Sequence, residues 1–317
     1  MVTPRDDAIF ADQLFVFAEQ NQASLTALLD RGGPTGSDDS FALSQGSSAR
    51  GWIEAIGSFL DPAAPDAPRF HASSGGVEGG VDIGWGDDAR VGASLGYERS
   101  SLTDSDGGAA SQNTLRLSAY GQVDAGRLVL SAAADYAHGN EDFDRAAGFG
   151  VSVTSRDVNE WAGAVQAALP LEAGGTKITP AAGFVFASIG SDAFQETNAQ
   201  SSAFAVSGSG GSQSSFSPFA KVRISHAFTQ GSGMVITPAA ELGYRYDAAA
   251  GGRGQALMAA DGTPFIAPGP GLSRSSAIVG ASLTAKQGRF AGFVRYQANI
   301  AGDWNLQSVS AGFKVAF

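Results

Sequence analysis

Three histidines are the side chains of this 317-residue sequence best suited to acid–base chemistry, because the chain contains no cysteine. The lack of cysteine excludes disulfides, thiolate metal sites and a cysteine nucleophile. A hydrolytic histidine needs an acid and a nucleophile that converge on it. The best candidate is His138, which has acidic neighbours at Asp135, Glu141, Asp142 and Asp144. His71 and His226 are predicted at opposite ends of the fold. We therefore favour a solvated loop for His138 and predict no catalytic residue.

Two acidic clusters, Asp104-Ser-Asp106 and Asn140-Glu-Asp142, carry the oxygen ligands that Ca²⁺ prefers. Neither has the full spacing of a calcium-binding loop, and long surface loops are commonly polar. We interpret both clusters as loop segments and predict no metal and no cofactor.

The composition excludes several classes of protein. The net charge is −11 and the pI is about 4.6, so nucleic acid is not an expected partner, because phosphate binding needs clustered Lys and Arg. Glycine occurs 43 times and only 16% of residues are charged, which is roughly twice the usual glycine content. These glycines lie inside alternating apolar runs, where they indicate close backbone packing or a bend.

The first 49 residues are predicted to form a helix followed by a linker. Thr3 is a suitable N-cap, Pro4 fits the first helical position, and apolar residues then follow helical spacing over residues 4–31. A helix of this length would measure roughly 40 Å, about the depth of a bilayer. The polar segment 35–48 separates it from the rest. We expect residues 1–49 to form a helix-and-linker unit and residues 50–317 to form one β-domain.

From Arg50 to Phe317 the apolar residues follow a period of two, which is typical of strands. Several predicted strands reach the ~9–11 residues that a tilted membrane strand needs. A sheet in hydrocarbon can have no open edge, so it must close. The sequence therefore predicts an all-β, 12-stranded antiparallel transmembrane barrel. Its strands are expected at about 50–60, 74–85, 90–102, 113–123, 127–138, 151–169, 176–190, 214–228, 234–247, 273–285, 289–300 and 305–317.

The two faces of these strands differ in chemistry, with apolar residues on one and charges on the other. This pattern favours a barrel with lipid outside and water inside. We expect the charges of the polar face to pair across the wet interior and to stiffen it: Arg90, Glu98, Arg116, Glu160, Lys221, Arg223, Glu241, Arg245 and Arg295. Aromatic residues near the strand ends suit interfacial girdles: Trp52, Trp85, Tyr97, Tyr136, Tyr246, Tyr296 and Trp304.

The connections alternate between two lengths. Every second link is a short glycine-containing turn, as at Asp124–Gly126 and Lys286–Gly288. Most of the others are long and predicted to be irregular: 61–73, 103–112, 139–150, 191–213 and 248–272. Short turns on one side and long loops on the other are typical of bacterial outer-membrane barrels. We expect the long loops to be extracellular and the short turns periplasmic.

The final hairpin carries a resemblance to a known family. It reads VRYQANIAGDW over 294–304 and QSVSAGFKVAF over 307–317, and with weaker matches along residues 50–317 it resembles the C-terminal β-domain of classical autotransporters, which serve type V secretion. The resemblance implies a helix threaded through the lumen and a covalently linked passenger upstream. It also implies that the barrel-assembly machinery recognises the C-terminal strand through Phe313, Val315 and Phe317. We expect a monomer embedded in outer-membrane lipid.

One feature fits the resemblance less well. Phe10, Leu14, Phe15 and Phe17 are bulkier and more apolar than a wet lumen prefers, so part of the helix is expected outside the pore or against a passenger. An outer-membrane protein must also be exported, so a signal peptide is expected upstream of Met1. Two alternatives stay open: a passenger-less porin or adhesin-like barrel with the helix as a plug, and an outer-membrane hydrolase.

Overall fold

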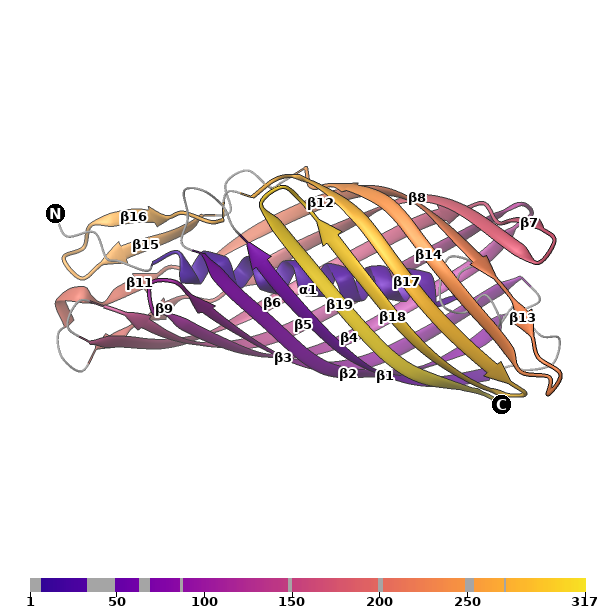
Figure 1. Cartoon of the computed structure of the whole chain (residues 1–317). Helices are drawn as coiled ribbons and strands as arrows, with labels where there is room; N and C mark the ends of the chain where they lie inside the picture. The colour runs from indigo at the N-terminus through magenta and orange to yellow at the C-terminus, as the bar shows by residue number, and fades with distance from the viewer. Residues whose placement is uncertain are drawn as a thin grey trace.

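Twelve long strands form the body of the molecule in the computed structural model (Figure 1). The structure describes residues 7–32, 49–62, 69–85, 88–147, 150–198, 202–248, 254–270 and 272–317. The long strands are β1 Ala49–Pro62, β2 Phe70–Trp85, β3 Ala89–Asp104, β4 Ala109–Ala125, β5 Leu128–Ala146, β6 Val151–Ala168, β8 Thr176–Ser191, β12 Gly211–His226, β14 Val235–Tyr246, β17 Ser275–Gln287, β18 Phe290–Ile300 and β19 Trp304–Ala316.

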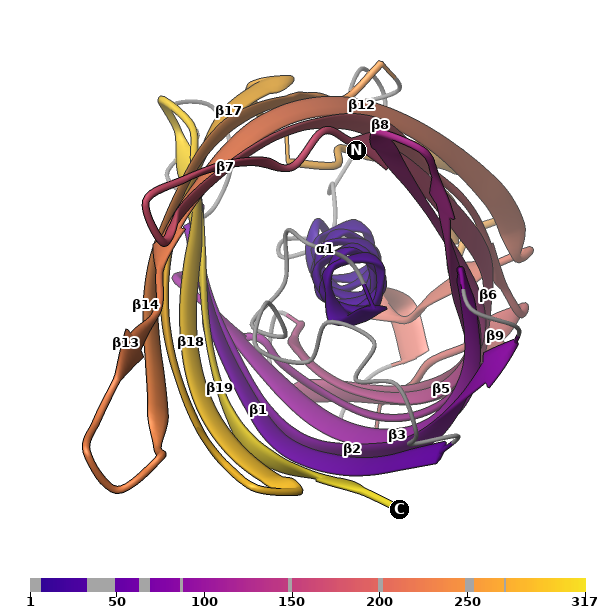
Figure 2. The same cartoon turned by 90° about the vertical axis from the view of Figure 1, so that its right-hand side faces the viewer.

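The sheet closes on itself, so the prediction of a 12-stranded antiparallel barrel is confirmed. Each long strand pairs with its sequence neighbour, and β1 pairs with β19 from Arg50↔Ala316 to Pro62↔Trp304. Figure 2, a view along the barrel, shows the closed ring around a central helix. Closure leaves the long strands without a free edge, which hydrocarbon requires.

Side chains alternate between the lumen and the outer surface along each strand. In β4, Leu115 and Leu117 are 52% and 59% exposed, while Arg116 between them is 3% exposed. A soluble protein would bury such leucines, whereas a membrane barrel presents them to lipid. The alternation predicted from the sequence thus sets which residues meet lipid and which line the lumen.

The strands extend farther than the hydrophobic pattern indicates at one end. β5 continues to Ala146 and β2 begins at Phe70, so the prediction of irregular loops at 139–150 and 61–73 is wrong where these strands run. Backbone pairing in β5 continues past the apolar run, where the outward residues Asn140, Asp142 and Asp144 are polar, so the apolar alternation that marks a strand disappears.

Short strands also occupy the two longest links, which were predicted to be irregular. Four of them form a second sheet in the order β16-β15-β11-β9 at the long-loop end of the barrel (Figure 1). The short strands of the chain are β7 Leu171–Ala173, β9 Phe194–Gln195, β10 Thr197–Asn198, β11 Val206–Gly208, β13 Phe228–Thr229, β15 Gln255–Ala259 and β16 Pro264–Ala267, and Ser202–Phe204 form a 3₁₀ turn, η2.

Glycines on the lumen side make room for inward-facing aromatic rings. Trp52 lies opposite Gly80 in the ladder, and a Cβ on Gly80 would lie 2.7 Å from the indole ring. Tyr120 lies opposite Gly92 in the same way, with 2.5 Å to its ring. The indole N–H of Trp52 donates a 2.7 Å hydrogen bond to the Tyr120 hydroxyl. Strand glycines therefore act as recesses for aromatic side chains in this wall.

Two aromatic residues expected in the interfacial girdles lie inside the barrel instead. Trp52 and Trp304 are only 5% and 4% exposed. Trp52 packs in a cluster with the leucines of the central helix, and Trp304 packs against Phe15 of that helix. Their side chains find partners there, Tyr120 for one indole and the Ser273 carbonyl for the other. Trp85, Tyr97, Tyr246 and Tyr296 are exposed, and Tyr136 is half-buried.

The α-helix of the described residues, α1, spans Ile9–Gly32 and lies in the lumen along the barrel axis (Figures 1 and 2). Its N-terminal end faces the long loops and its C-terminal end the short turns. Its 24 residues give a length of roughly 36 Å. The expected N-cap Thr3 and Pro4 lie outside the described residues. In the described part of the chain, no helix has the length and apolarity to span a membrane.

Candidate functional site

The candidate site is the lumen, where α1 fills the centre of the barrel. The helix contributes both apolar and charged residues to the contact, and almost all of them are buried. The contact extends from the long-loop end of the barrel to the short-turn end.

At the long-loop end the helix is held by an aromatic cluster. The Phe10 ring lies 4.8 Å from that of Phe143 and 4.5 Å from that of Phe194, measured between centroids. Phe15 meets Trp304 edge-on at 6.0 Å. The expectation that these bulky residues sit outside the pore is wrong: Phe10 and Phe15 are 0% and 4% exposed. An apolar pocket surrounds these rings, built by β5, by short strands of the second sheet such as β9 and β15, and by β19. Period-two patterning does not reveal this pocket.

An arginine links the same end of the helix to three strands. Arg156 of β6 donates to the carbonyl of Phe10 at 2.8 Å, to Glu141 at 2.5 Å and to Gln255 of β15 at 2.9 Å. Hydrogen bonds between charged groups are stronger than neutral ones, and a buried guanidinium must be fully satisfied. Arg156 therefore joins β5, β6, α1 and, through β15, the second sheet into one unit.

A polar layer surrounds the middle of the helix. Arg245 binds Glu19 at 2.7 Å, and Arg116 donates to the side-chain oxygen of Asn21. Arg116 also lies 3.5 Å from Glu98 and 3.7 Å from Asp135. Opposite charges within this range stabilise one another when shielded from water.

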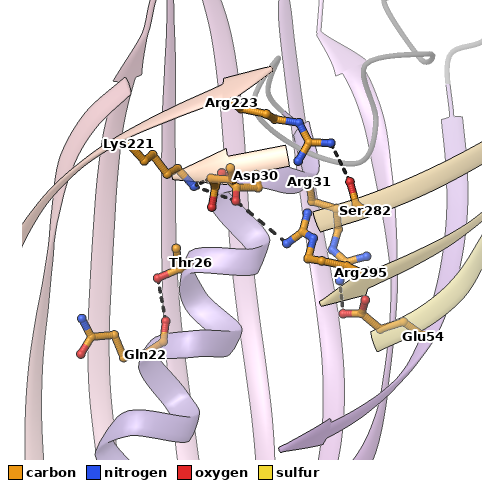
Figure 3. A network of polar contacts seen from close by, with 10 residues as sticks. Gln22, Thr26, Asp30, Arg31, Glu54, Lys221, Arg223, Ser282 and Arg295 are labelled. Carbon is orange, nitrogen blue, oxygen red and sulfur yellow. Dashed lines mark hydrogen bonds and ion pairs between the residues drawn. The ribbon is translucent and has the colours of Figure 1, made fainter. Parts of the chain in front are cut away.

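The last turns of the helix combine an apolar contact with ion pairs. Leu25, Leu28 and Leu29 pack in one cluster with Trp52 and Tyr120. Figure 3 shows the ion pairs: Asp30 lies between Lys221 and Arg295, and Arg31 reaches Glu54. The Lys221 ammonium lies 2.7 Å from Asp30 and 3.4 Å from Glu241. Arg31 also stacks 3.5 Å above the Trp52 ring.

The structure places the nine charges predicted for the polar face as follows. Four contact the helix directly or at 4.0 Å: Arg116, Lys221, Arg245 and Arg295. Glu160 lies beside Asn21 of the helix. The other four lie in the wall: Arg90 pairs with Asp82, Arg223 donates to Ser282 at 2.9 Å, and Glu98 and Glu241 are buried. The function of these charges stays a prediction.

Sequence reasoning missed several residues of the site. Gln13 donates to Gln112 at 2.7 Å, and both side chains are fully buried. Arg145 forms a two-bond ion pair with Glu196, at 2.7 and 2.6 Å. Arg145, Arg156 and Gln112 share the inward parity of their strands. That parity could have identified Arg156 within the strand predicted at 151–169, and Gln112 and Arg145 had their predicted strands been longer.

The candidate catalytic histidine lies on the wrong face of its strand. His138 is an exposed residue in the middle of β5, where it contacts Asn159 at 2.9 Å. Asp135 and Glu141 of the same strand are buried on the lumen side. His71 lies in β2 beside Asp61. Neither Asp135 nor Glu141 therefore faces His138. The prediction of a solvated loop for His138 is wrong, because this residue lies within β5.

The two acidic clusters also differ from expectation. Asn140 and Asp142 point outward from β5 while Glu141 points inward, so the three oxygen groups cannot converge. Asp104 accepts hydrogen bonds from the amides of Asp106 and Gly108 and closes a turn. Within the described residues, no group of three or more His, Asp or Glu side chains is arranged to hold a metal ion.

The C-terminal strand exposes its apolar residues. Phe313 is 56% and Phe317 is 71% exposed on the outer surface, and Val315 is half-buried. β19 pairs on both sides, with β18 and β1. Recognition of these residues by an assembly factor stays a prediction.

Comparisons with known proteins show which protein family has this architecture. The family model of the autotransporter beta-domain matches residues 51–297. The translocator domain of autotransporter NalP from Neisseria meningitidis superposes with a TM-score of 0.78 at 15% identity, over 98% of this chain and 99% of that one. A comparison with curated proteins finds no match.

Two further solved structures share the fold. The beta domain of the Bordetella autotransporter BrkA gives a TM-score of 0.64 at 16% identity, over 85% of this chain and 100% of that one. The transport unit of AIDA-I from Escherichia coli gives 0.57 at 12% identity, over the full length of both. These likenesses show the fold, and the family match covers most of the sequence. The chain therefore belongs to the autotransporter beta-domain family, the non-catalytic outer-membrane barrels of type V secretion that export a passenger across the outer membrane.

Proposed function

We propose that this barrel, after export, holds α1 as a fixed plug, with its N-terminal end directed to the cell surface. The observation that carries the proposal is the chain of contacts from Phe10 to Arg31, which is anchored to the wall at both ends. The lumen-side charges keep the helix in place and solvate the wall. Residues 1–49 act as the link to a passenger, and residues 50–317 form the barrel.

The proposed orientation places the long loops outside the cell and the short turns in the periplasm. It is supported by the asymmetry of the connections, which outer-membrane barrels share. Because the chain has no cysteine, single substitutions can report it. Asp261→Cys, in the β15–β16 hairpin, is expected to react with a membrane-impermeant maleimide on intact cells. Ser232→Cys, in the β13–β14 turn, is expected to react only after the outer membrane is permeabilised. The opposite result would reverse the orientation.

The proposal includes recognition of the C-terminal strand during assembly, and function as a monomer. Exposed Phe313 and Phe317 support the first part, because an extended strand with alternating apolar residues suits capture by β-augmentation. Phe317→Ser is expected to lower the amount of folded barrel in the outer membrane severalfold. Phe290→Ser, at a comparably exposed position of β18, is the control. Equal loss in both variants would contradict a special role for the C-terminus.

A further inference from the structure

One face of α1 is an apolar stripe with a single polar interruption. Leu14, Phe17, Asn21, Leu25 and Leu28 are spaced by three or four residues, which places them on one side of a helix. All five are buried. Asn21 is the only member that can form a hydrogen bond through its side chain.

The barrel wall carries a complementary sequence of layers. Leu14 and Phe17 pack in a cluster with Ala137, Val158 and Ile189. Leu25 and Leu28 pack in a separate cluster that contains Tyr120, Ala133 and Ala164. The wall therefore carries an apolar cluster on each side of the level that Asn21 occupies.

Between the two apolar clusters the wall is charged. Arg116 of β4 and Glu160 of β6 lie opposite the same residue of β5, Ala137, and are 3% and 0% exposed. Arg116 donates to the Asn21 side-chain oxygen. Glu160 lies beside Asn21, and among the described residues neither its carboxylate oxygens nor the Asn21 amide nitrogen has a hydrogen-bond partner. The one polar residue of the stripe thus meets charged side chains of the wall between two apolar clusters.

A slide of the helix by one turn would break this match. It would bring Phe17 or Leu25 to the level of Arg116 and place Asn21 against an apolar layer, leaving buried polar groups without partners on both sides. Long side chains such as Lys221 and Arg245 can follow a small displacement by changing rotamer. The short side chain of Asn21 cannot.

We propose that Asn21 and the Arg116–Glu160 layer form a register key that fixes the axial resting position of α1 in the pore. A single buried asparagine sets register in coiled coils by the same physics. In a barrel that exports a passenger, the key determines where the chain stops and how much of it stands above the rim. The key rests on contacts within the lumen and does not depend on the orientation proposed above.

Cross-linking in the full chain tests the key, since there is no native cysteine to interfere. Gln13 Nε2 lies 3.5 Å from Ser100 Oγ, so Gln13→Cys with Ser100→Cys reports the native register through a short bifunctional maleimide. Phe17→Cys with Ser100→Cys reports an outward slide of one turn. Only barrels that resist unfolding in cold detergent gels are scored. With Asn21 in place, the native pair is expected to react and the shifted pair to stay at background.

Asn21→Leu is expected to raise the ratio of shifted to native cross-link by about tenfold or more, since a buried unpaired polar group disfavours a state by roughly that factor. A second variant moves the key: Asn21→Leu combined with Leu25→Asn exchanges the same two residue types, so the apolar content is unchanged. It is expected to raise the ratio further. Thr26→Val, which removes a hydroxyl that donates to the Gln22 carbonyl within α1, is the control and should leave the ratio near the native value.

The two variants together decide the proposal. If folded Asn21→Leu and the exchanged variant both keep the native ratio, the register is set elsewhere and the key is refuted. The same conclusion follows if Thr26→Val raises the ratio as much as Asn21→Leu. Should Asn21→Leu fold poorly, the exchanged variant still distinguishes a moved register from an unmoved one.

Discussion

Lys221 and Asp30 form a buried ion pair, and their contribution depends on solvent exclusion. Lys221→Met is expected to destabilise the folded protein by about 3 kcal/mol, the lower end of the range for a broken buried pair, because Arg295 remains 4.0 Å from Asp30. Thermal unfolding in detergent, followed by tryptophan fluorescence, measures this change.

The matched control is Lys177→Met. Lys177 lies 4.0 Å from Glu172, whose side chain is 74% exposed, so the loss should be below about 1 kcal/mol. Equal losses in the two variants would show that burial does not strengthen the lumen pair.

Asp7, just before α1, gives the helix end a pH dependence. Burial raises the pKa of its carboxyl, against the opposing effects of backbone hydrogen bonds and Arg145. A raised pKa means that the docked state binds the proton more readily than the undocked state. Docking is therefore most favourable below the ordinary pKa of aspartate and weakens as the pH rises through the raised value.

Asp7→Asn should mimic the protonated form. At pH 7 the variant is expected to protect the first turn of α1 from hydrogen exchange more than the native chain does, and at about pH 3, below the ordinary pKa of aspartate, the two should match. Weaker protection in Asp7→Asn at pH 7 would contradict this account.

At the scale of elements, the strands depend on glycine recesses. A Cβ at Gly80 would lie 2.6 Å from the Ala93 carbonyl oxygen as well as against Trp52, and overpacking of this kind typically costs about 1–3 kcal/mol. Gly80→Ala is therefore expected to lower the yield and stability of folded barrel, measured by refolding into detergent micelles.

Gly75→Ala in the same strand is the control, since its nearest atom would be the Ile56 carbonyl oxygen at 4.0 Å. If both variants fold alike, the recess is not needed.

The strands show how far sequence patterns reach. Period-two alternation predicted all twelve strands because lipid and lumen impose opposite polarity on successive residues. It could not predict the extension of β5 to Ala146, where the outward residues are polar, nor the inward position of Trp52, which needs Gly80 on a neighbouring strand. Contacts between distant elements carry no local pattern.

The same limit applies to the lumen. Inward parity identified Lys221 and Arg245, yet their partners Asp30 and Glu19 lie on a helix whose depth and rotation the sequence leaves open. The aromatic end of α1 was misjudged for this reason. A Phe in a wet lumen is unfavourable, but Phe10 lies in a dry cluster formed by β5 and the loop strands.

At the scale of the whole molecule, the barrel closes without help from the helix, because every long strand pairs on both sides. Deletion of residues 1–32 is therefore expected to leave a folded barrel and to open a conducting pore in planar bilayers. The intact chain should conduct far less. Loss of folding, or unchanged conductance in a folded barrel, would show that α1 is not the plug.

The central claim is that α1 lies in the pore with its N-terminal end reaching the cell surface. The most direct test expresses the chain in a Gram-negative host, behind a signal peptide and an N-terminal epitope tag, and adds protease to intact cells. We expect the tag to be removed while the membrane-embedded barrel persists. A tag that is cut only after the outer membrane is permeabilised would contradict the account and would favour a plugged porin.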